Sequence, residues 1–539
     1  MVSHIAHLPA AAAGGVGRDV RRSCRAIAHV VRNMSRPVST TGSMLEQAMA
    51  LHRQGDLPAA EKQYRAILTL QPDNPDALHL LGTIRADLGN ADEGIALIER
   101  ALRLFPALPD AHYNLGNIHR RHRRMKAAEH HFRQALKLQP ANARTLGNLG
   151  GVLTQLERYD DAERYTQDAL RLDPKLVEAR LNLAALHDIR GRFADTIPLY
   201  DAILGEFPKD AETHYMRALT ILLRGRLEEG WEEFRWRLER PQTRGFHGLF
   251  KFPYWRGESL QDKRILVWTE QGPGDELLIG TMLPDVVSVA KQVVLIASER
   301  IAPLFARAFP SVKVIAADNT PLDPTLLTDV GFQASLSELG RWLRPTFQAF
   351  PKTEGYLKAD HDLAAALRLN YLRDRPGTRL VGLSWQSRNP DLEAEKSMSL
   401  ANLADILRTP GLTFVNLQYG DCAAEIAGVN RDLGISMIHD PTIDPLRDLT
   451  RFAAQTAAMD LIISVSNTTV HMGGALGRPT WAMIPANRGR MWYWFLNRED
   501  SPWYGSVRLF RGTTDMGWKP AVERVAAELA RWRDLSTPQ

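Results

Sequence analysis

Five prolines of this chain stand at a constant distance from one another. They are 34 residues apart, at Pro72, Pro106, Pro140, Pro174 and Pro208. Each follows a stretch rich in Ile and Leu and ends a helix there, because proline has no N–H and clashes with the preceding turn. A period of this length is typical of a repeated pair of helices. The sequence therefore predicts an all-helical first half, and a second half without the period that forms separate domains.

Small residues recur in the same register as the prolines. The middle of the first helix carries a Leu-Gly pair in three repeats, and the second helix carries a small residue in all six: Ala60, Gly94, Ala128, Ala162, Thr196 and Gly230. Small residues let two helices approach closely where they cross. Together with the period, this pattern is that of the tetratricopeptide repeat (TPR). We expect six TPR repeats over residues 41–244, stacked into an α-solenoid whose groove holds a protein or peptide partner.

The ends and the composition limit the class of protein. Residues 1–40 are Ala- and Gly-rich and then Arg-rich, so we expect a disordered N-terminal extension. No apolar run approaches the roughly 20 residues of a membrane span. The only cysteines are Cys24 and Cys422, which suits a reducing compartment. These features favour a cytoplasmic protein without a transmembrane segment.

The third repeat contains a basic run, from His119 to Arg124. Such runs usually face water, and no aromatic residues are interleaved here for base stacking. We therefore expect no nucleic-acid partner, with an RNA-binding surface as the weaker alternative. The adjacent pair His130-His131 makes no metal site, since neighbouring residues on a helix do not share a face.

Beyond a linker at residues 245–262, short apolar runs alternate with helical stretches. This alternation predicts parallel, Rossmann-like sheets in two units, over residues 263–365 and 366–539. We expect strands at 264–268, 293–296 and 312–315 in the first unit, and at 380–385, 413–418, 461–465 and 479–484 in the second. Aromatic residues in the run 492–495, with Trp503 and Tyr504, are expected to pack in the core rather than to stack on a sugar.

Three loops follow predicted strands, at residues 271–276, 385–398 and 464–471. Ligands of such sheets bind outside the carboxyl ends of the strands. In the third loop Ser466, Asn467, Thr468 and Thr469 precede a helix, and the free N–H groups of a helix start suit an anion such as a diphosphate. His471 lies in the first turn of that helix. The alternative is a plain helix cap beside a packed histidine.

The second half resembles ADP-heptose:lipopolysaccharide heptosyltransferases, and the whole chain resembles bacterial TPR-containing glycosyltransferases. The matching segments are Ile265–Pro284, Val381–Trp385, Asn416–Asp421, Leu461–Trp481 and Ser501–Arg511. The resemblance implies the GT-B fold, which is a pair of Rossmann-like domains with a cleft between them. A TPR array joined to such a domain is also similar to the layout of protein O-GlcNAc transferases.

The resemblance also implies roles for single residues. Asp275, in the turn with Gly274, would be the general base, and Lys396 would neutralise the leaving diphosphate. His471 would contact the phosphates or the leaving group, and Gln418 the nucleoside. Asp275 as a helix cap and Lys396 as a surface lysine are the alternatives. Members of this family usually have Asp-Thr where this chain has Ser466-Asn467, which indicates a different donor or a weakened enzyme.

The resemblance implies a metal-independent glycosyltransferase of the hexosyl- or heptosyltransferase kind. It would need no cofactor besides its donor substrate, a nucleotide-diphosphate sugar. The acceptor is open between a protein and a glycan recruited by the TPR groove. The alternative function is a TPR scaffold whose GT-B half is catalytically silent.

Overall fold

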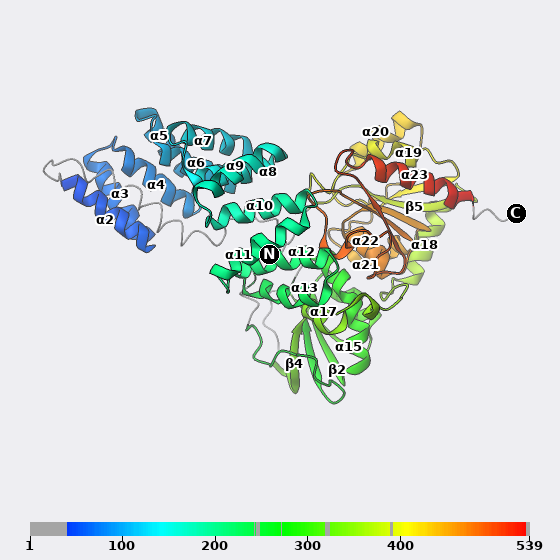
Figure 1. Cartoon of the computed structure of the whole chain (residues 1–539). Coiled ribbons are helices and arrows are strands. Elements are labelled where there is room, and N and C mark those ends of the chain that lie inside the picture. Colours follow the sequence, from blue (N-terminus) through cyan, green and yellow to red (C-terminus); the bar gives the residue numbers. More distant parts are fainter. Residues whose placement is uncertain are drawn as a thin grey trace. The chain divides into compact units, whose positions relative to one another are not determined.

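A computed structural model describes residues 40–241, 243, 248–270, 272–317, 324–388 and 392–534. The predicted N-terminal extension lies outside these residues, apart from Thr40, with which the first described helix begins. The chain forms two compact units that divide after Thr213. Figure 1 shows the helices of the first unit in blue to green and the α/β part of the second in green to red.

The first unit consists of antiparallel helix pairs joined by short turns (Figure 1). Its second helices each end two residues before one of the five prolines, so the prolines mark the repeat boundaries as predicted. The pairs are α2 (Thr40–Gln54) with α3 (Leu57–Leu70), α4 (Pro75–Asp87) with α5 (Ala91–Leu104), α6 (Pro109–Arg121) with α7 (Met125–Leu138), α8 (Ala143–Gln155) with α9 (Tyr159–Leu172), and α10 (Val177–Ile189) with α11 (Phe193–Glu206).

Small residues lie where the two helices of a pair cross. A Cβ atom added to Gly82 would be 2.6 Å from the carbonyl oxygen of Gly94 on the partner helix. In the next repeat, a Cβ atom on Gly116 would be 2.6 Å from the ring of Phe132. Real Cβ atoms do not approach other atoms this closely, so glycine is required for the observed helix separation.

The sixth predicted pair, α12 (Ala211–Leu223) and α13 (Leu227–Phe234), packs within the second unit. The indole of Trp231 donates a hydrogen bond to the carbonyl oxygen of Arg344 at 2.9 Å. Arg237, in the 3-10 helix η2 (Arg235–Glu239), forms an ion pair with Glu270 at 2.6 Å, and both side chains are almost fully buried. The last helix pair is therefore structurally part of the α/β unit.

The first sheet of the second unit has four parallel strands in the order β3-β2-β1-β4. The strands are β1 (Arg264–Trp268), β2 (Gln292–Ser298), β3 (Lys313–Ala317) and β4 (Val330–Ser335). Its helices are α14 (Pro273–Ile279), α15 (Leu283–Val289), α16 (Ala302–Ala308) and α17 (Gly340–Leu343). The alternation of β1, β2 and β3 with helices is as predicted, whereas β4 was not predicted.

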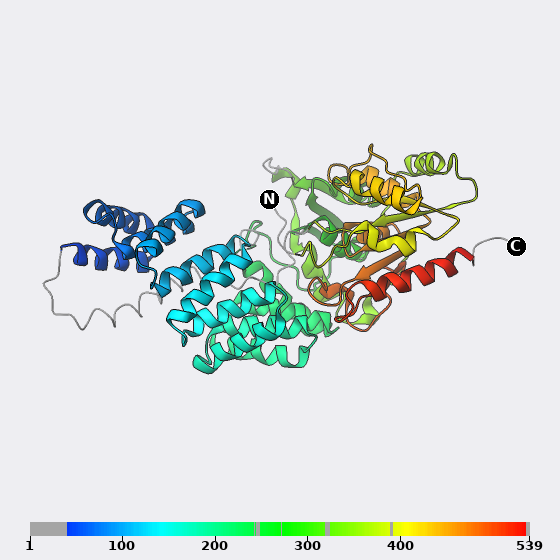
Figure 2. The ribbon, with the colours of Figure 1, turned by 90° about the horizontal axis from the view of Figure 1, so that it is seen from above.

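The second sheet has five parallel strands in the order β6-β5-β7-β8-β9. Figure 2 shows this half of the chain in yellow-green to red. They are β5 (Arg379–Ser384), β6 (Leu412–Asn416), β7 (Leu461–Val465), β8 (Thr480–Ile484) and β9 (Val507–Arg511). The helices of this half are α18 (His361–Leu372), α19 (Ala404–Leu407), α20 (Ala423–Leu433), α21 (Leu449–Ala457), α22 (Thr468–Ala475) and α23 (Lys519–Asp534). Completely buried strands β7 and β8 lie at its centre.

Two predicted boundaries differ from the structure. The division expected between residues 365 and 366 falls inside α18, whose Arg368 donates to the carbonyl oxygen of Ala458 at 2.8 Å. The division therefore precedes His361. The linker at 245–262, of which residues 245–247 are not described, packs on the first sheet: Gln333 of β4 donates to the carbonyl oxygens of Phe250 and Phe252.

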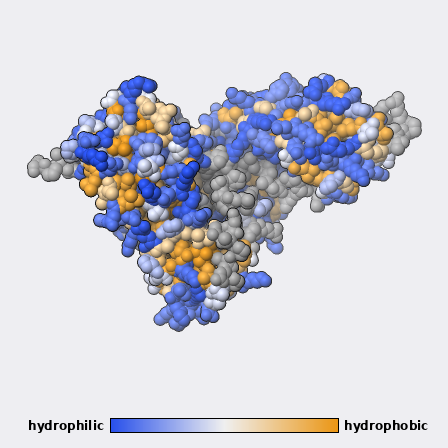
Figure 3. All heavy atoms as spheres, turned by 180° about the vertical axis from the view of Figure 1, so that it is seen from behind, coloured by the Kyte–Doolittle hydropathy of each residue, from blue (hydrophilic) through white to orange (hydrophobic). Residues whose placement is uncertain are grey.

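Figure 3 shows hydrophilic residues over most of the face that it presents, with smaller hydrophobic areas between them. Among the described residues, no helix combines the length and the apolar character that crossing a membrane requires.

Candidate ligand site at the carboxyl ends of the strands

Two short helices bring the first and third predicted loops together. Helix α14 starts after β1, and α22 starts after β7. A Cβ atom on Gly274 of α14 would be 3.3 Å from the imidazole Cδ2 of His471 and 3.5 Å from the hydroxyl of Thr468. Three of the predicted site residues therefore lie in contact, and glycine at position 274 permits the approach. Gln271, in the first loop, lies outside the described residues.

Asp275 and Lys396 are two charged groups of this region. The Asp275 side chain keeps partial access to solvent. Burial raises the pKa of its carboxyl to about 7, although the positive charge of Lys396 acts to lower it. The Lys396 side chain is 5% exposed. Burial lowers the pKa of its ammonium to about 8, while Asp275 acts in the opposite direction. Both groups thus titrate near neutral pH because they are removed from water.

Neither charge is neutralised by contact with the protein. Across the described ranges, neither the Asp275 carboxylate nor the Lys396 ammonium has a hydrogen-bond partner, or an ion-pair partner within 4.0 Å. Asp275 does not cap α14, whose N-cap is Gly272 without a side-chain hydrogen bond. Lys396 is not a surface lysine. The Lys396 Nζ atom keeps some contact with solvent, and a ligand in the site would offset the cost of its partial desolvation.

His471 is buried between two tyrosines. Its side chain is 2% exposed. Nδ1 lies 3.2 Å from the hydroxyl of Tyr504, and Nε2 lies 3.3 Å from the hydroxyl of Tyr493. Burial, and then the charge of Lys396, lowers the pKa of the imidazole to about 3. The ring is therefore neutral at physiological pH, and both of its nitrogens are engaged by hydroxyl groups of the protein.

Asn467 and Ser466 connect the start of α22 to its surroundings. Asn467 caps the helix by accepting from the Thr469 N–H at 2.9 Å, and it donates to the hydroxyl of Ser384 at 2.7 Å. Ser466, where the resembled family usually has Asp, accepts from the indole of Trp494 at 2.7 Å. Thr468 alone of the four residues in this turn is partly exposed. The turn is thus anchored from several sides, and Thr468 faces outward.

Gln418 shapes the second loop from within. Its side-chain oxygen accepts from the backbone N–H groups of Trp385 and Gln386, at 2.9 and 2.8 Å. Its side-chain nitrogen donates to the carbonyl oxygen of Tyr419 at 3.1 Å. The amide is 3% exposed and engaged at both ends, so in this structure Gln418 holds the backbone that follows β5. Residues 389–391 of that loop lie outside the described residues.

A fourth loop, after β8, belongs to the site and was not predicted. Gly489 in this loop has φ +87°, and the alkyl chain of Lys396 lies against it. The neighbouring Arg488 forms an ion pair with Glu395 in which both side chains are nearly buried. The rule that ligands bind at the carboxyl ends of strands applies equally to β8, and would have indicated this loop from the sequence.

The sequence raised two further kinds of site, a metal site and a basic surface for nucleic acid. Among the residues that the structure describes, no group of three or more His, Cys, Asp or Glu side chains is arranged to hold a metal ion. In the basic run of the third repeat, Arg121 pairs with Asp87 at 2.6 Å and Arg124 with Asp92 at 3.6 Å. These arginines therefore contact acidic groups of the preceding repeat.

Comparison with known proteins identifies the repeats of the first half. The family model described as tetratricopeptide repeat matches residues 45–109, 79–143, 113–177 and 148–211. Residues 45–211 therefore form a TPR array, of the class whose stacked repeats form extended binding surfaces. The match ends at residue 211, where the sixth helix pair begins.

Two solved structures are similar to part of this chain. A tetratricopeptide repeat protein from Parabacteroides merdae shows 22% identity and a TM-score of 0.33, covering 37% of this chain and 78% of that protein. The TPR protein TTC0263 from Thermus thermophilus shows 22% identity and a TM-score of 0.30, covering 34% of this chain and 100% of that protein.

The match to one curated relative is longer than the repeat region. Protein FlbA of Caulobacter vibrioides is 34% identical over 336 residues, which is 60% of this chain and 56% of FlbA. The chain thus spans little more than half the length of this relative.

Proposed function

We propose that this protein is a glycosyltransferase, which moves a sugar from a nucleotide-diphosphate donor to an acceptor recruited by the TPR array. The observation that supports this most is the pair Asp275 and Lys396, two charges that converge from different sheets without a protein partner. Parallel α/β sheets bind ligands at this edge. A diphosphate would supply the negative charge that Lys396 lacks.

The chemistry follows from the two charges. The acceptor hydroxyl gives its proton to the Asp275 carboxylate as its oxygen attacks the anomeric carbon of the donor sugar. The bond between that carbon and the diphosphate oxygen breaks, and the departing negative charge meets the Lys396 ammonium. A base with a pKa of about 7 is half deprotonated at physiological pH, which is the range where general bases work best.

His471 takes a supporting part in this proposal. Its nitrogens are engaged by Tyr493 and Tyr504, and its neutral ring packs against Gly274 beside Asp275. The imidazole therefore fixes the wall of the site on the side of α14. For His471 to contact the donor phosphates, the hydroxyl of Tyr493 or of Tyr504 would have to move away from its imidazole nitrogen.

The test is calorimetric binding of UDP, GDP, ADP and CMP to the full chain. We expect one nucleoside diphosphate to bind, and Lys396→Met to weaken it at least tenfold, because the variant removes the only cation that we assign to the leaving group. The control is Lys519→Met, since Lys519 is an exposed lysine of α23 whose ammonium lies 3.7 Å from Glu523. Equal affinity of wild type and Lys396→Met would overturn the role of Lys396.

The second candidate function is a TPR scaffold with a silent α/β half. It is favoured by the TPR array itself and by Ser466 standing where the resembled family usually has Asp. Absence of binding by all four nucleotides to folded protein would make this the better description. A partner protein that binds the array of the full chain equally well in the Lys396→Met variant would support it further.

A further inference from the structure

The segment Trp492–Leu496 touches the sixth helix pair with some of its residues. The ring of Trp492 meets the ring of Trp231 edge-on, with centroids 5.3 Å apart and an interplanar angle of 86°. It also lies 5.7 Å from the ring of Phe234. The backbone N–H of Leu496 donates to the carbonyl oxygen of Leu223, the last residue of α12, at 3.0 Å. Helices α12 and α13 thus hold both ends of the segment.

The residues between these two ends form the wall of the candidate site. The hydroxyl of Tyr493 lies 3.3 Å from His471 Nε2. The indole of Trp494 stacks on the His471 ring, at 5.4 Å and 9°, and its N–H donates to Ser466 at 2.7 Å. Both aromatic side chains are buried. Neighbouring residues of one short segment therefore contact the sixth helix pair and the site.

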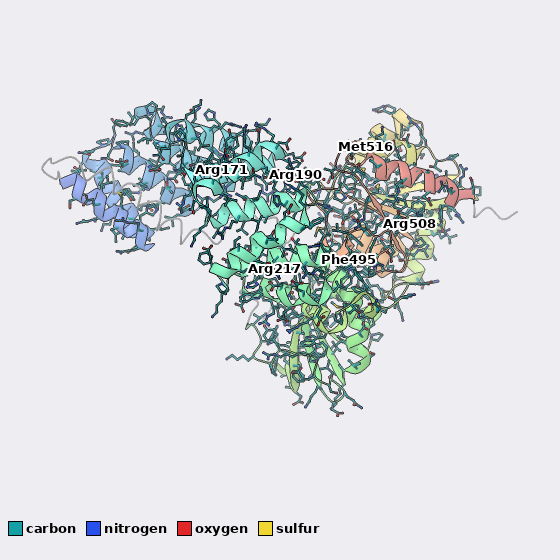
Figure 4. The ribbon with its side chains drawn as sticks, in the orientation of Figure 1. Arg171, Arg190, Arg217, Phe495, Arg508 and Met516 are labelled. Atoms are coloured by element: carbon teal, nitrogen blue, oxygen red, sulfur yellow. The ribbon has the colours of Figure 1, made fainter. Side chains whose placement is uncertain are left out.

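The backbone of the segment is strained at Phe495, which is labelled in Figure 4. Its φ of 43° and ψ of 166° are dihedral angles that residues other than glycine rarely adopt, and such a conformation persists only where its surroundings enforce it. Here Phe347 packs edge-on against the Phe495 ring at 4.9 Å. Arg511 donates to the carbonyl oxygens of Trp494 and Phe495, at 2.7 and 2.6 Å.

We propose that Tyr493 and Trp494 are positioning residues of the donor site, and that the sixth helix pair holds them in place through Trp492 and Leu496. The role in donor binding rests on the proposed function. The mechanical link does not, because it follows from the contacts alone. A displacement of α13 would move Trp492, and the strained, clamped turn would pass that movement to the residues that engage His471 and Ser466.

The link can be tested without any ligand, through the indole N–H resonance of Trp494 in full-length protein labelled with ¹⁵N-tryptophan. Trp494→Phe assigns the resonance, and Ser466→Ala shows how it responds to loss of the hydrogen bond. We expect Trp231→Phe and Trp492→Phe to shift it. The matched control is Trp255→Phe, because Trp255 packs against Trp342, 6.2 Å away, and does not touch the segment. An unchanged Trp494 resonance in both Trp231→Phe and Trp492→Phe would overturn the link.

The positioning role is tested with the nucleoside diphosphate that wild type binds. We expect Trp492→Phe to weaken it by roughly 2- to 30-fold, with a fall in Tm no larger than that of Trp255→Phe. Equal weakening in both variants would refute a specific role of the segment. If wild type binds none of the nucleotides tested, the proposed function fails, and the Trp494 resonance still decides whether the link exists.

Discussion

The alkyl chain of Lys396 lies directly on the backbone of Gly489. A Cβ atom at position 489 would be 2.7 Å from Lys396 Cγ and 3.2 Å from Pro485 Cγ, and the φ of Gly489 is +87°. No side chain fits there. The loop after β8 therefore fixes the course of the lysine side chain, and with it the place of an ammonium that has no partner in the described chain.

This contact predicts that Gly489→Ala weakens nucleotide binding as strongly as Lys396→Met, because the added methyl group displaces the lysine. The measurement is calorimetric titration with the diphosphate that wild type binds. The control is Gly377→Ala: Gly377 has a similar φ of +77° but nothing within 4 Å of its Cβ position. That variant has the backbone strain without the collision. A Gly489→Ala variant with wild-type affinity would show that the position of the Lys396 side chain does not depend on its contact with Gly489.

The pH dependence of transfer follows from Asp275 and Lys396. Asp275 becomes an active base as pH rises through its pKa of about 7, and Lys396 loses its charge as pH rises through its pKa of about 8. We therefore expect a bell-shaped profile of kcat/KM with its maximum between these values. Lys396→Arg keeps the charge at high pH, so its falling limb should move upward. A profile without a falling limb in wild type would contradict the role of the lysine.

The helix crossings of the TPR array predict a contrast between two glycines. Gly82→Ala should destabilise the α4–α5 pair by about 1–3 kcal/mol, because its Cβ atom would be 2.6 Å from the carbonyl oxygen of Gly94. Gly205→Ala should stabilise α11 by about 0.5–1 kcal/mol, since nothing lies within 4 Å of that position. Hydrogen exchange of peptides from α4, α5 and α11 measures both. Slower exchange in Gly82→Ala would refute close packing at the crossing.

The buried ion pair of Arg237 and Glu270 predicts a non-additive effect on stability. Arg237→Leu leaves the Glu270 carboxylate buried without its partner, at a cost of about 3–5 kcal/mol. The double variant Arg237→Leu/Glu270→Leu should be more stable than Arg237→Leu, since no lone charge remains. Urea unfolding of the full chain compares the variants. Additive losses in the double variant would show that the two groups do not depend on each other.

The repeats and most strands were predictable because local patterns determine them. The prolines act on the helix that precedes them, and the apolar runs at 264–268 and 461–465 became β1 and β7 with the same bounds. Strand β9 was missed, and so was β4. Its Gln333 is buried because it bonds to the carbonyl oxygens of Phe250 and Phe252, and such partners, about 80 residues away, leave no mark on the local sequence.

The charged residues of the site could be predicted from the sequence, whereas the contacts of the aromatic residues around them could not. The carboxyl-end rule brought Asp275, Lys396 and His471 to one edge, and the structure places Gly274 against His471. Tyr493 belongs to a run of aromatic residues that the sequence predicts to be buried, and its side chain is buried. Its contact with His471 depends on the conformation of Phe495, a residue type for which positive φ is not expected from sequence.

The packing of Trp231 has a consequence for how the chain folds during synthesis. Helices of the first unit pair with near neighbours, so each repeat can form soon after it leaves the ribosome. Trp231 instead bonds to Arg344, and Arg237 to Glu270 and Ser335. The sixth pair therefore cannot complete its packing until about a hundred further residues have been translated, and its aromatic face stays exposed until then. That interval is when the growing chain most needs protection from aggregation.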